Sequence, residues 1–169
     1  MTDRETWPRV TDILKSAGLI DTTWFTDEAR ARGTAVHLAC QYLDEGCLDE
    51  ATVAEEIRPY LAAYQRFRAE VITGEWTAIE QPVYHETLRY RGTPDRVFGS
   101  WLYDIKTGGP LAWHGPQLAA YAACLPEITR RIGLYLSVDG GYNLVEYKDR
   151  DDWKVFQAAL TVHNFKEAR

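Results

Sequence analysis

Apolar residues recur at every third or fourth position in the first half of the chain, which is the spacing of one helical face. This pattern predicts a short helix over 8–18, a second helix from Thr26 towards Gly46, and a third helical region over 49–71. Pro59 marks a restart within the third region, because proline is tolerated in the first turn of a helix and disfavoured in its interior.

From residue 76 onward, runs of β-branched and aromatic residues replace the helical spacing. The stretch 76–84 and the stretch 88–98 are predicted strands, and Trp101 to Lys106 forms the next one. Gly99-Ser100 lies between the last two, and glycine in the first position of a two-residue loop favours a type II′ hairpin turn. We therefore expect a meander of three antiparallel strands.

The last third of the chain alternates helical and extended patterns. The pattern predicts a helix over 117–125, a strand pair at 131–138 and 142–147, and a closing helix from Asp151. The strand at 131–138 follows a helix, so a right-handed crossover places it parallel to the strand that ends at Lys106. The resulting fold class is α/β, with a mixed, mainly antiparallel sheet of about five strands flanked by helices.

Composition is that of one globular domain spanning residues 1–169, with 46% hydrophobic, 12% aromatic and 26% charged residues. Apolar runs stay far below the ~20 residues of a membrane span, and the first residues lack the pattern of a signal peptide. We therefore expect a cytoplasmic protein without a membrane partner. The net charge of −6 argues against nucleic acid, unless an acidic metal site contributes to it.

The hairpin brings charged residues together. Its register places Asp95 across from Asp104, and the two-residue period of a strand puts Lys106 on the same face as Asp104. Opposed carboxylates repel each other, so a cation is expected between them. Two acids and an ammonium suit metal-assisted phosphodiester hydrolysis. The alternative is a hairpin whose charged side chains simply face water.

Two further residues are either metal ligands or ordinary structural residues. Glu80 points inward if its strand is regular, and an inward glutamate must be paired or bind a cation. His37 lies beside the apolar stripe of the second helix, where a histidine is either a boundary residue or a ligand.

These residues resemble the motifs of the PD-(D/E)XK nuclease superfamily, in its branch of RecB-like and phage-type recombination exonucleases. The motif appears as Pro94-Asp95 followed by Asp104-Ile105-Lys106. That branch also carries Gln-x-x-x-Tyr on the helix after the lysine strand, matched by Gln117 and Tyr121. A histidine on an early helix is matched by His37, and a glutamate before the hairpin is matched by Glu80.

The resemblance implies Mg²⁺ or Mn²⁺ as cofactor. Asp95, Asp104, His37 and the carbonyl of Ile105 would coordinate one metal ion, and Glu80 would support a second metal ion or a bound water. An iron–sulfur cluster, present in some relatives, is not expected, because it needs four cysteines and the chain has three.

The implied activity is that of a DNA exonuclease in recombination or repair, of phage or prophage type, which acts with or without a recombination partner protein. Lys106 would position and activate the attacking water, and Gln117 and Tyr121 would hold the DNA strand. Three alternatives stay open: a structure-selective or restriction-type endonuclease, an inactive nuclease fold that binds DNA or protein, and a small-molecule or structural module. The last would leave the opposed Asp95 and Asp104 unexplained.

Overall fold

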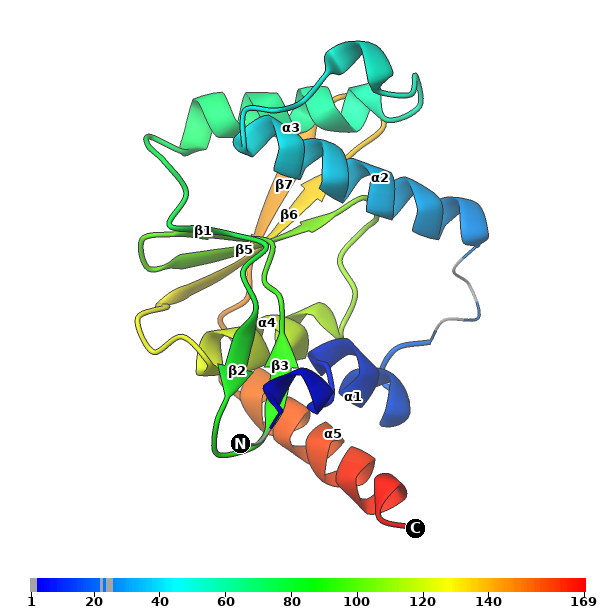
Figure 1. Cartoon of the computed structure of the whole chain (residues 1–169), viewed down its shortest axis with the longest axis vertical. Helices are drawn as coiled ribbons and strands as arrows, with labels where there is room; N and C mark the ends of the chain where they lie inside the picture. Colours follow the sequence, from blue (N-terminus) through cyan, green and yellow to red (C-terminus); the bar gives the residue numbers. More distant parts are fainter. Residues whose placement is uncertain (1–2, 22, 24–25) are drawn as a thin grey trace.

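A computed structural model describes residues 3–21, 23 and 26–169 of the chain. Among these residues, five strands form one mixed sheet in the order β1-β4-β5-β6-β7, with helices on both faces (Figure 1). The strands are β1 (Ala78–Ile79), β4 (Arg96–Phe98), β5 (Trp101–Lys106), β6 (Arg130–Leu136) and β7 (Tyr142–Glu146). Only β5 and β6 pair in parallel within this described sheet, which confirms the predicted fold class and the predicted crossover.

The helices divide into two layers. In Figure 1, α2 and α3 lie above the sheet, whereas α1, α4 and α5 lie below it. Their bounds are α1 (Val10–Ser16), α2 (Asp27–Asp44), α3 (Arg58–Val71), α4 (His114–Ala123) and α5 (Asp151–Glu167), with short 3₁₀ helices η1 (Arg4–Thr6) and η2 (Glu50–Thr52). Thr26 caps α2 by accepting the N–H of Ala29, and Pro59 occupies the first turn of α3 as expected.

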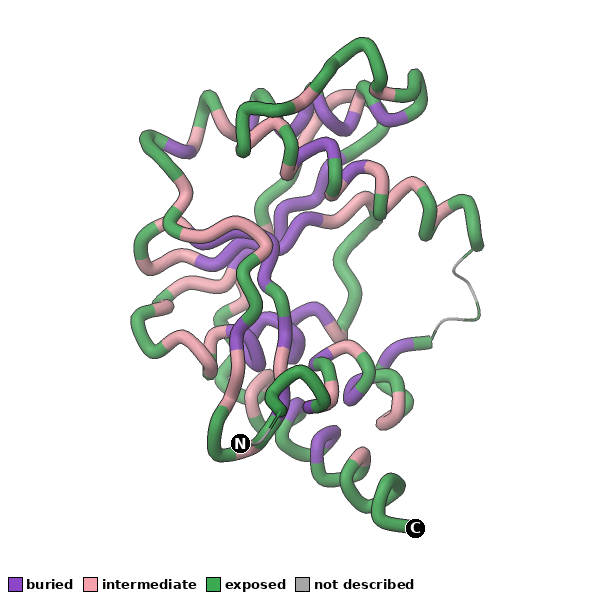
Figure 2. Tube along the Cα trace, in the orientation of Figure 1, coloured by how far each residue is buried: buried purple, intermediate pink, exposed green. Residues whose placement is uncertain are grey.

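Two hydrophobic cores fill the space between these layers, one on each side of the sheet (Figure 2). Successive side chains of β5 alternate between them. Tyr103 and Ile105 pack into the core under α2 and α3, and Leu102 packs into the core with α4. Asp104 and Lys106 share the face of Leu102, so the α4 side of the sheet carries both charges.

The hairpin between β4 and β5 has the predicted register, with Phe98 paired to Trp101 and Arg96 to Tyr103. Gly99 has a φ of 56°, which is the left-handed conformation that the predicted turn requires of its first residue. The ladder ends at Arg96, however, so the expected direct pairing of Asp95 with Asp104 is wrong. The Asp95 carboxylate accepts the N–H of Ile105 instead, at 2.5 Å.

The predicted strand over 76–84 is divided between two sheets. Its first part is β1, and its end is β2 (Val83–His85), which pairs with β3 (Tyr90–Gly92) in a separate two-stranded sheet. The predicted antiparallel pairing of the three strands is confirmed, since β1 pairs with β4 and β4 pairs with β5, but the first two strands are not continuous. Glu80 adopts a φ of 47° and Pro82 lacks an N–H donor, so the ladder cannot continue through this segment.

Gly92 allows α4 to pack closely on this second sheet. A Cβ at this position would lie 2.3 Å from the ring of Tyr121, a distance that no side chain can occupy. The helix that carries Tyr121 begins at His114, three residues before the predicted start. Within the described parts of the chain, no helix is both long and apolar enough to cross a membrane.

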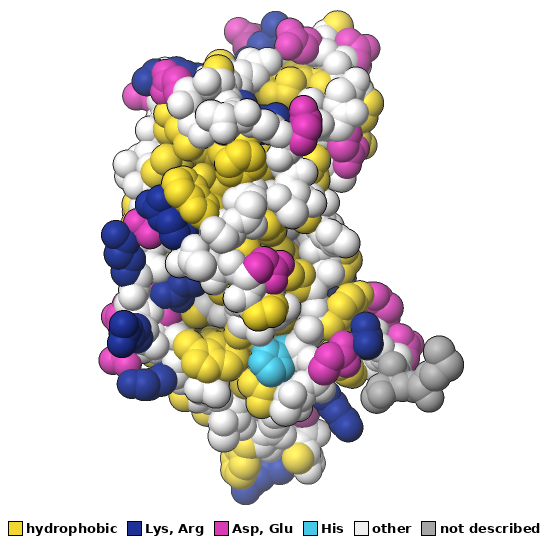
Figure 3. All heavy atoms as spheres, turned by 90° about the vertical axis from the view of Figure 1, so that its left-hand side faces the viewer, with side chains coloured by type: hydrophobic (Ala, Val, Ile, Leu, Met, Phe, Trp, Pro, Cys, Tyr) yellow, Lys and Arg dark blue, Asp and Glu magenta, His cyan; other side chains and the backbone are white. Residues whose placement is uncertain are grey.

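The surface charge is unevenly distributed. On the face of the molecule in Figure 3, which looks onto the left-hand side of Figure 1, lysine and arginine side chains gather along one edge. The net charge of −6 therefore does not describe every surface of the protein.

Candidate metal centre

Three side chains of ligand type converge at the start of the hairpin. His37 comes from α2, Glu80 from the bend after β1, and Asp95 from the residue before β4. One ligand atom from each lies within 4.8 Å of the other two. The closest contact is between His37 Nδ1 and Asp95 Oδ1, at 3.3 Å. This group contains an imidazole and two carboxylates, which are ligands that a divalent ion accepts.

The backbone around Asp95 fixes the position of this acid. Its Oδ2 accepts the N–H of Ile105, and its carbonyl accepts the N–H of Glu80 at 3.0 Å. The left-handed conformation of Glu80 ends β1 and turns this residue toward the hairpin. In an antiparallel strand the N–H and C=O of one residue face the same side, so the Ile105 carbonyl lies on the Asp95 side of β5.

Asp104 forms a second cluster with Lys106. The ammonium of Lys106 lies 2.6 Å from Asp104 Oδ2, and it donates to Gln117 Oε1 at 3.2 Å. Gln117 in turn donates to the hydroxyl of Tyr121, at 3.0 Å. The predicted shared face of Asp104 and Lys106 is therefore confirmed, and their charges neutralise each other directly.

Gln117 and Tyr121 are placed differently from what the sequence suggests. Each is only 4% exposed, so neither side chain forms an open polar surface on α4. They lie behind Lys106 and fix the direction of its ammonium through the chain of hydrogen bonds just described. Their burial favours a role in orienting the lysine over direct contact with a nucleic-acid strand.

The charges shift one another's proton affinities in opposite directions. Burial alone would lower the pKa of His37, but the charge and hydrogen bond of Asp95 raise it to about 9. Burial alone would raise the pKa of Asp95, but the charge of His37 brings it below its usual value. Burial and the charge of Asp95 raise the pKa of Asp104, despite the nearby Lys106. Burial, together with the charge of Asp95, raises the pKa of Glu80 to about 7.

No protein-family model and no curated protein matches this chain. Its structure is similar to the crystal structure of an alkaline exonuclease from Laribacter hongkongensis, at 16% sequence identity and a TM-score of 0.49. The superposition covers 95% of this chain and 91% of the exonuclease chain.

The site is open to solvent on the α2 side. A cavity of about 470 Å³ is bordered by His37 and Glu80 together with Gly33, Leu38 and other residues of α2. An ion or a substrate phosphate can therefore reach His37 and Glu80 without a rearrangement of the helices.

A buried arginine, Arg96, which the sequence pattern did not identify, supports the site from the side of α2 and α3. The side chain of Arg96 is fully buried, and its Nη1 donates to Glu80 Oε1 at 3.0 Å and to the Asp95 carbonyl at 2.6 Å. Its Nε donates to Asp44 Oδ2 at 2.6 Å, beside the hydroxyl of Tyr64. Asp44 is also paired with Arg68, so the last turn of α2 is tied to α3 and the hairpin.

A signal for this arginine exists in the sequence. The hairpin register places Arg96 across from Tyr103, and the latter lies on the strongly apolar face of β5. An arginine on that face needs acidic partners, because an unpaired buried charge is very unfavourable. The register does not identify those partners, since Asp44 is 52 residues away in the sequence.

The donor set fits a hard divalent ion. Carboxylate oxygens suit Mg²⁺ and Mn²⁺, and a neutral imidazole is accepted by Mn²⁺ more readily than by Mg²⁺. His37, Glu80 and Asp95 are within reach of one such ion, whereas Asp104 is not in this group and is engaged with Lys106. Participation of Asp104 requires that its ion pair with the lysine be loosened.

Proposed function

We propose that this protein is a divalent-metal-dependent deoxyribonuclease that hydrolyses phosphodiester bonds, most simply as an exonuclease in DNA recombination or repair. The observation that carries this proposal is the convergence of His37, Glu80 and Asp95 within 4.8 Å, at the end of the hairpin that also holds the Asp104–Lys106 pair. Such a site combines ligands for a hard cation with a partly buried ammonium. The motif resemblance found in the sequence points to the same chemistry.

Each residue has a definite role in this proposal. His37, Asp95 and the carbonyl of Ile105 would hold Mg²⁺ or Mn²⁺, Asp104 would join them once its ion pair with Lys106 opens, and Glu80 would support a second ion or a water. The bound ion supplies Lewis acidity and charge neutralisation at the phosphate.

Lys106 acts at the reacting atoms. Its ammonium hydrogen bonds to the attacking water and stabilises the negative charge that develops as the phosphodiester bond breaks. Gln117 and Tyr121 keep that ammonium in position. The substrate in this proposal is DNA. A recombination protein is a further partner consistent with a role in DNA recombination.

The direct test is incubation with end-labelled linear DNA and with closed circular DNA, each with and without Mn²⁺. We expect loss of the linear DNA in Mn²⁺ and no loss in a chelator. Nicking of the circular DNA would show that the activity is that of an endonuclease, of structure-selective or restriction type, and not that of an exonuclease. Retention of both DNAs in every divalent ion would overturn hydrolysis and leave a nuclease fold that binds without cutting.

Two variants distinguish the site from nonspecific effects. Asp95→Asn removes the acid that contacts both His37 and Ile105, and it should abolish cleavage. Asp151→Asn removes an exposed acid that pairs with Lys154 on α5, and cleavage should be unchanged. Equal activity of the two variants would contradict the proposed site.

A further inference from the structure

A second cavity lies beside the proposed centre, on the other side of Lys106. It has a volume of about 300 Å³ and lies between the first half of α2 and the loop that precedes α4. Its walls include Arg30 and Arg32 from α2, Lys106 from the end of β5, and Leu111 and Trp113 from the loop. This volume is at the lower end of the range of small-molecule pockets and suits a single ring system.

The charge of this cavity is opposite to that of the protein as a whole. Three of its ten lining residues are cationic and none is acidic, although the chain has a net charge of −6. Asp27, which does not line the cavity, forms an ion pair with Arg30 at 3.1 Å. The Asp27 side chain is 96% exposed. A pair so exposed is weak and opens readily, so Arg30 remains available to an anion.

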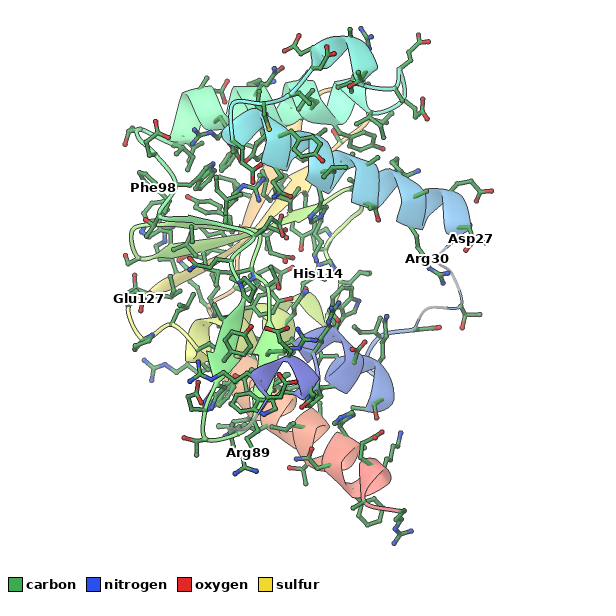
Figure 4. All side chains as sticks on the ribbon, viewed as in Figure 1. Asp27, Arg30, Arg89, Phe98, His114 and Glu127 are labelled. Carbon is green, nitrogen blue, oxygen red and sulfur yellow. The ribbon has the colours of Figure 1, made fainter. Side chains whose placement is uncertain are left out.

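The apolar part of the cavity is aromatic. Trp113 borders the cavity, and the ammonium of Lys106 lies 5.2 Å from the centre of its ring. In Figure 4, Arg30 projects from α2 toward the half of the molecule that carries α4, where His114 is labelled at the start of that helix. Arg32 is held in place by the ring of Tyr60, 5.9 Å from its guanidinium carbon.

We propose that this cavity binds one unpaired nucleotide of a nucleic-acid strand, with the base stacked on Trp113 and its phosphate facing Arg30 and Arg32. An aromatic platform next to cationic side chains is the chemistry that binds single-stranded nucleic acid without sequence readout. The ammonium that borders the platform is the one paired with Asp104, so the strand bound here continues toward the acidic residues.

This inference rests on the proposed function and narrows its substrate. A base in the interior of an intact duplex cannot stack on Trp113, because its neighbours in the stack cover both of its faces. The protein would therefore engage a frayed end, an overhang or a gap in preference to the interior of an intact duplex.

Binding of a fluorescein-labelled oligodeoxythymidine strand in a chelator, followed by fluorescence anisotropy, tests the cavity without cleavage. Trp113→Ala should weaken binding about tenfold, which is typical for loss of one base–aromatic contact, and Trp113→Phe should restore most of it. Wild-type protein should bind an abasic strand of equal length about tenfold more weakly, and Trp113→Ala should not weaken that binding further. Circular dichroism confirms that each variant is folded.

Matched controls separate stacking from general charge. Arg30 and Arg66 make comparable surface ion pairs on their helices, with side chains 56% and 60% exposed. Arg30→Ala should weaken binding and Arg66→Ala should not. Trp153→Ala, on α5 and away from the lining of this cavity, should bind like the wild type.

Several results would overturn the inference. Unchanged affinity of Trp113→Ala, or equal binding of normal and abasic strands, would show that only phosphates are bound. Competition by thymidine monophosphate as strong as that by the strand would assign the cavity to a free nucleotide. If the strand binds with the expected variant effects but is not cleaved in Mn²⁺, the nuclease proposal is rejected and the nucleotide-binding cavity is retained. If DNA is cleaved but Trp113→Ala binds the strand like the wild type, the nucleotide-binding cavity is rejected and the nuclease proposal is retained.

Discussion

Arg96 and Lys106 are both cations at the hairpin, but their surroundings differ. The Arg96 side chain is fully buried and bound on several sides, by Asp44, Glu80, the hydroxyl of Tyr64 and the carbonyl of Asp95. The Lys106 side chain is 18% exposed, pairs with Asp104 and borders a cavity. Arg96 connects α2, α3 and the hairpin, whereas Lys106 is held by one neighbouring helix and its own strand.

The difference shows how one strand pair can carry one cation that holds the ligands in place and another that can take part in the reaction. A planar guanidinium with fixed donors suits a site whose partners never change. A flexible ammonium with one open side can exchange an acid for a water or a phosphate. We therefore infer that Arg96 positions Glu80 and Asp95, and that Lys106 meets the substrate.

The largest expected effect is on the stability of the fold. Arg96→Ala leaves the buried carboxylate of Asp44 without its buried cationic partner, and removal of one member of a buried pair costs about 3–5 kcal/mol. Urea unfolding of Arg96→Ala beside Arg66→Ala measures this difference. The surface pair of Arg66 with Glu70 should contribute no more than about 1 kcal/mol. Equal losses in the two variants would show that Arg96 is not a structural centre.

The next effect is on catalysis. Lys106→Ala should reduce single-turnover DNA cleavage about a hundredfold, or about 3 kcal/mol, because a positioned donor to the transition state is lost. Its affinity for Mn²⁺, measured by calorimetry, should stay equal or rise, since the ammonium no longer competes for Asp104. Asp104→Asn should lose both cleavage and metal affinity. Wild-type cleavage by Lys106→Ala would remove the basis for the assigned role.

Metal addition should have a smaller but diagnostic effect on stability. Mn²⁺ at a hundred times its dissociation constant stabilises a folded binding site by about 2.7 kcal/mol, which raises the melting temperature. Asp95→Asn should remove most of this increase, because it removes one of the three converging ligands. Asp151→Asn should keep it. A wild-type melting curve that ignores both Mg²⁺ and Mn²⁺ would count against the metal centre.

The smallest effect per unit of the variable changed is the pH response of His114, which is buried near Lys106. Burial and the charge of Lys106 lower the pKa of His114 from 6.5 to about 3 in the folded protein. Below pH 6.5, His114 is protonated in the unfolded chain but stays neutral in the folded protein. The free energy of unfolding therefore falls as the pH is lowered, by at most about 1.4 kcal/mol per pH unit.

His114→Asn tests this response, because asparagine cannot titrate and keeps an acceptor for the N–H of Leu111. The stability curve of the variant should fall less steeply than that of the wild type between pH 6.5 and the folded-state pKa near 3. Parallel curves over this range would show that His114 is protonated equally in both states.

The sequence by itself determined the central hairpin. Gly99-Ser100 specifies a turn in which one residue has positive φ, and this turn sets the pairing of Arg96 with Tyr103. The two-residue period of a strand then places Lys106 beside Asp104. These features are local, because they depend on residues that are neighbours along the chain.

Tertiary structure alone decided how the acids are partnered. The ladder stops before Asp95 because this residue binds the backbone of Ile105 and the side chain of His37, which lies on a helix 58 residues earlier. The same packing places Glu80 against Arg96 and buries Gln117 behind Lys106. Periodicity identifies the face on which a side chain lies, but the helix that covers that face determines which charges meet there.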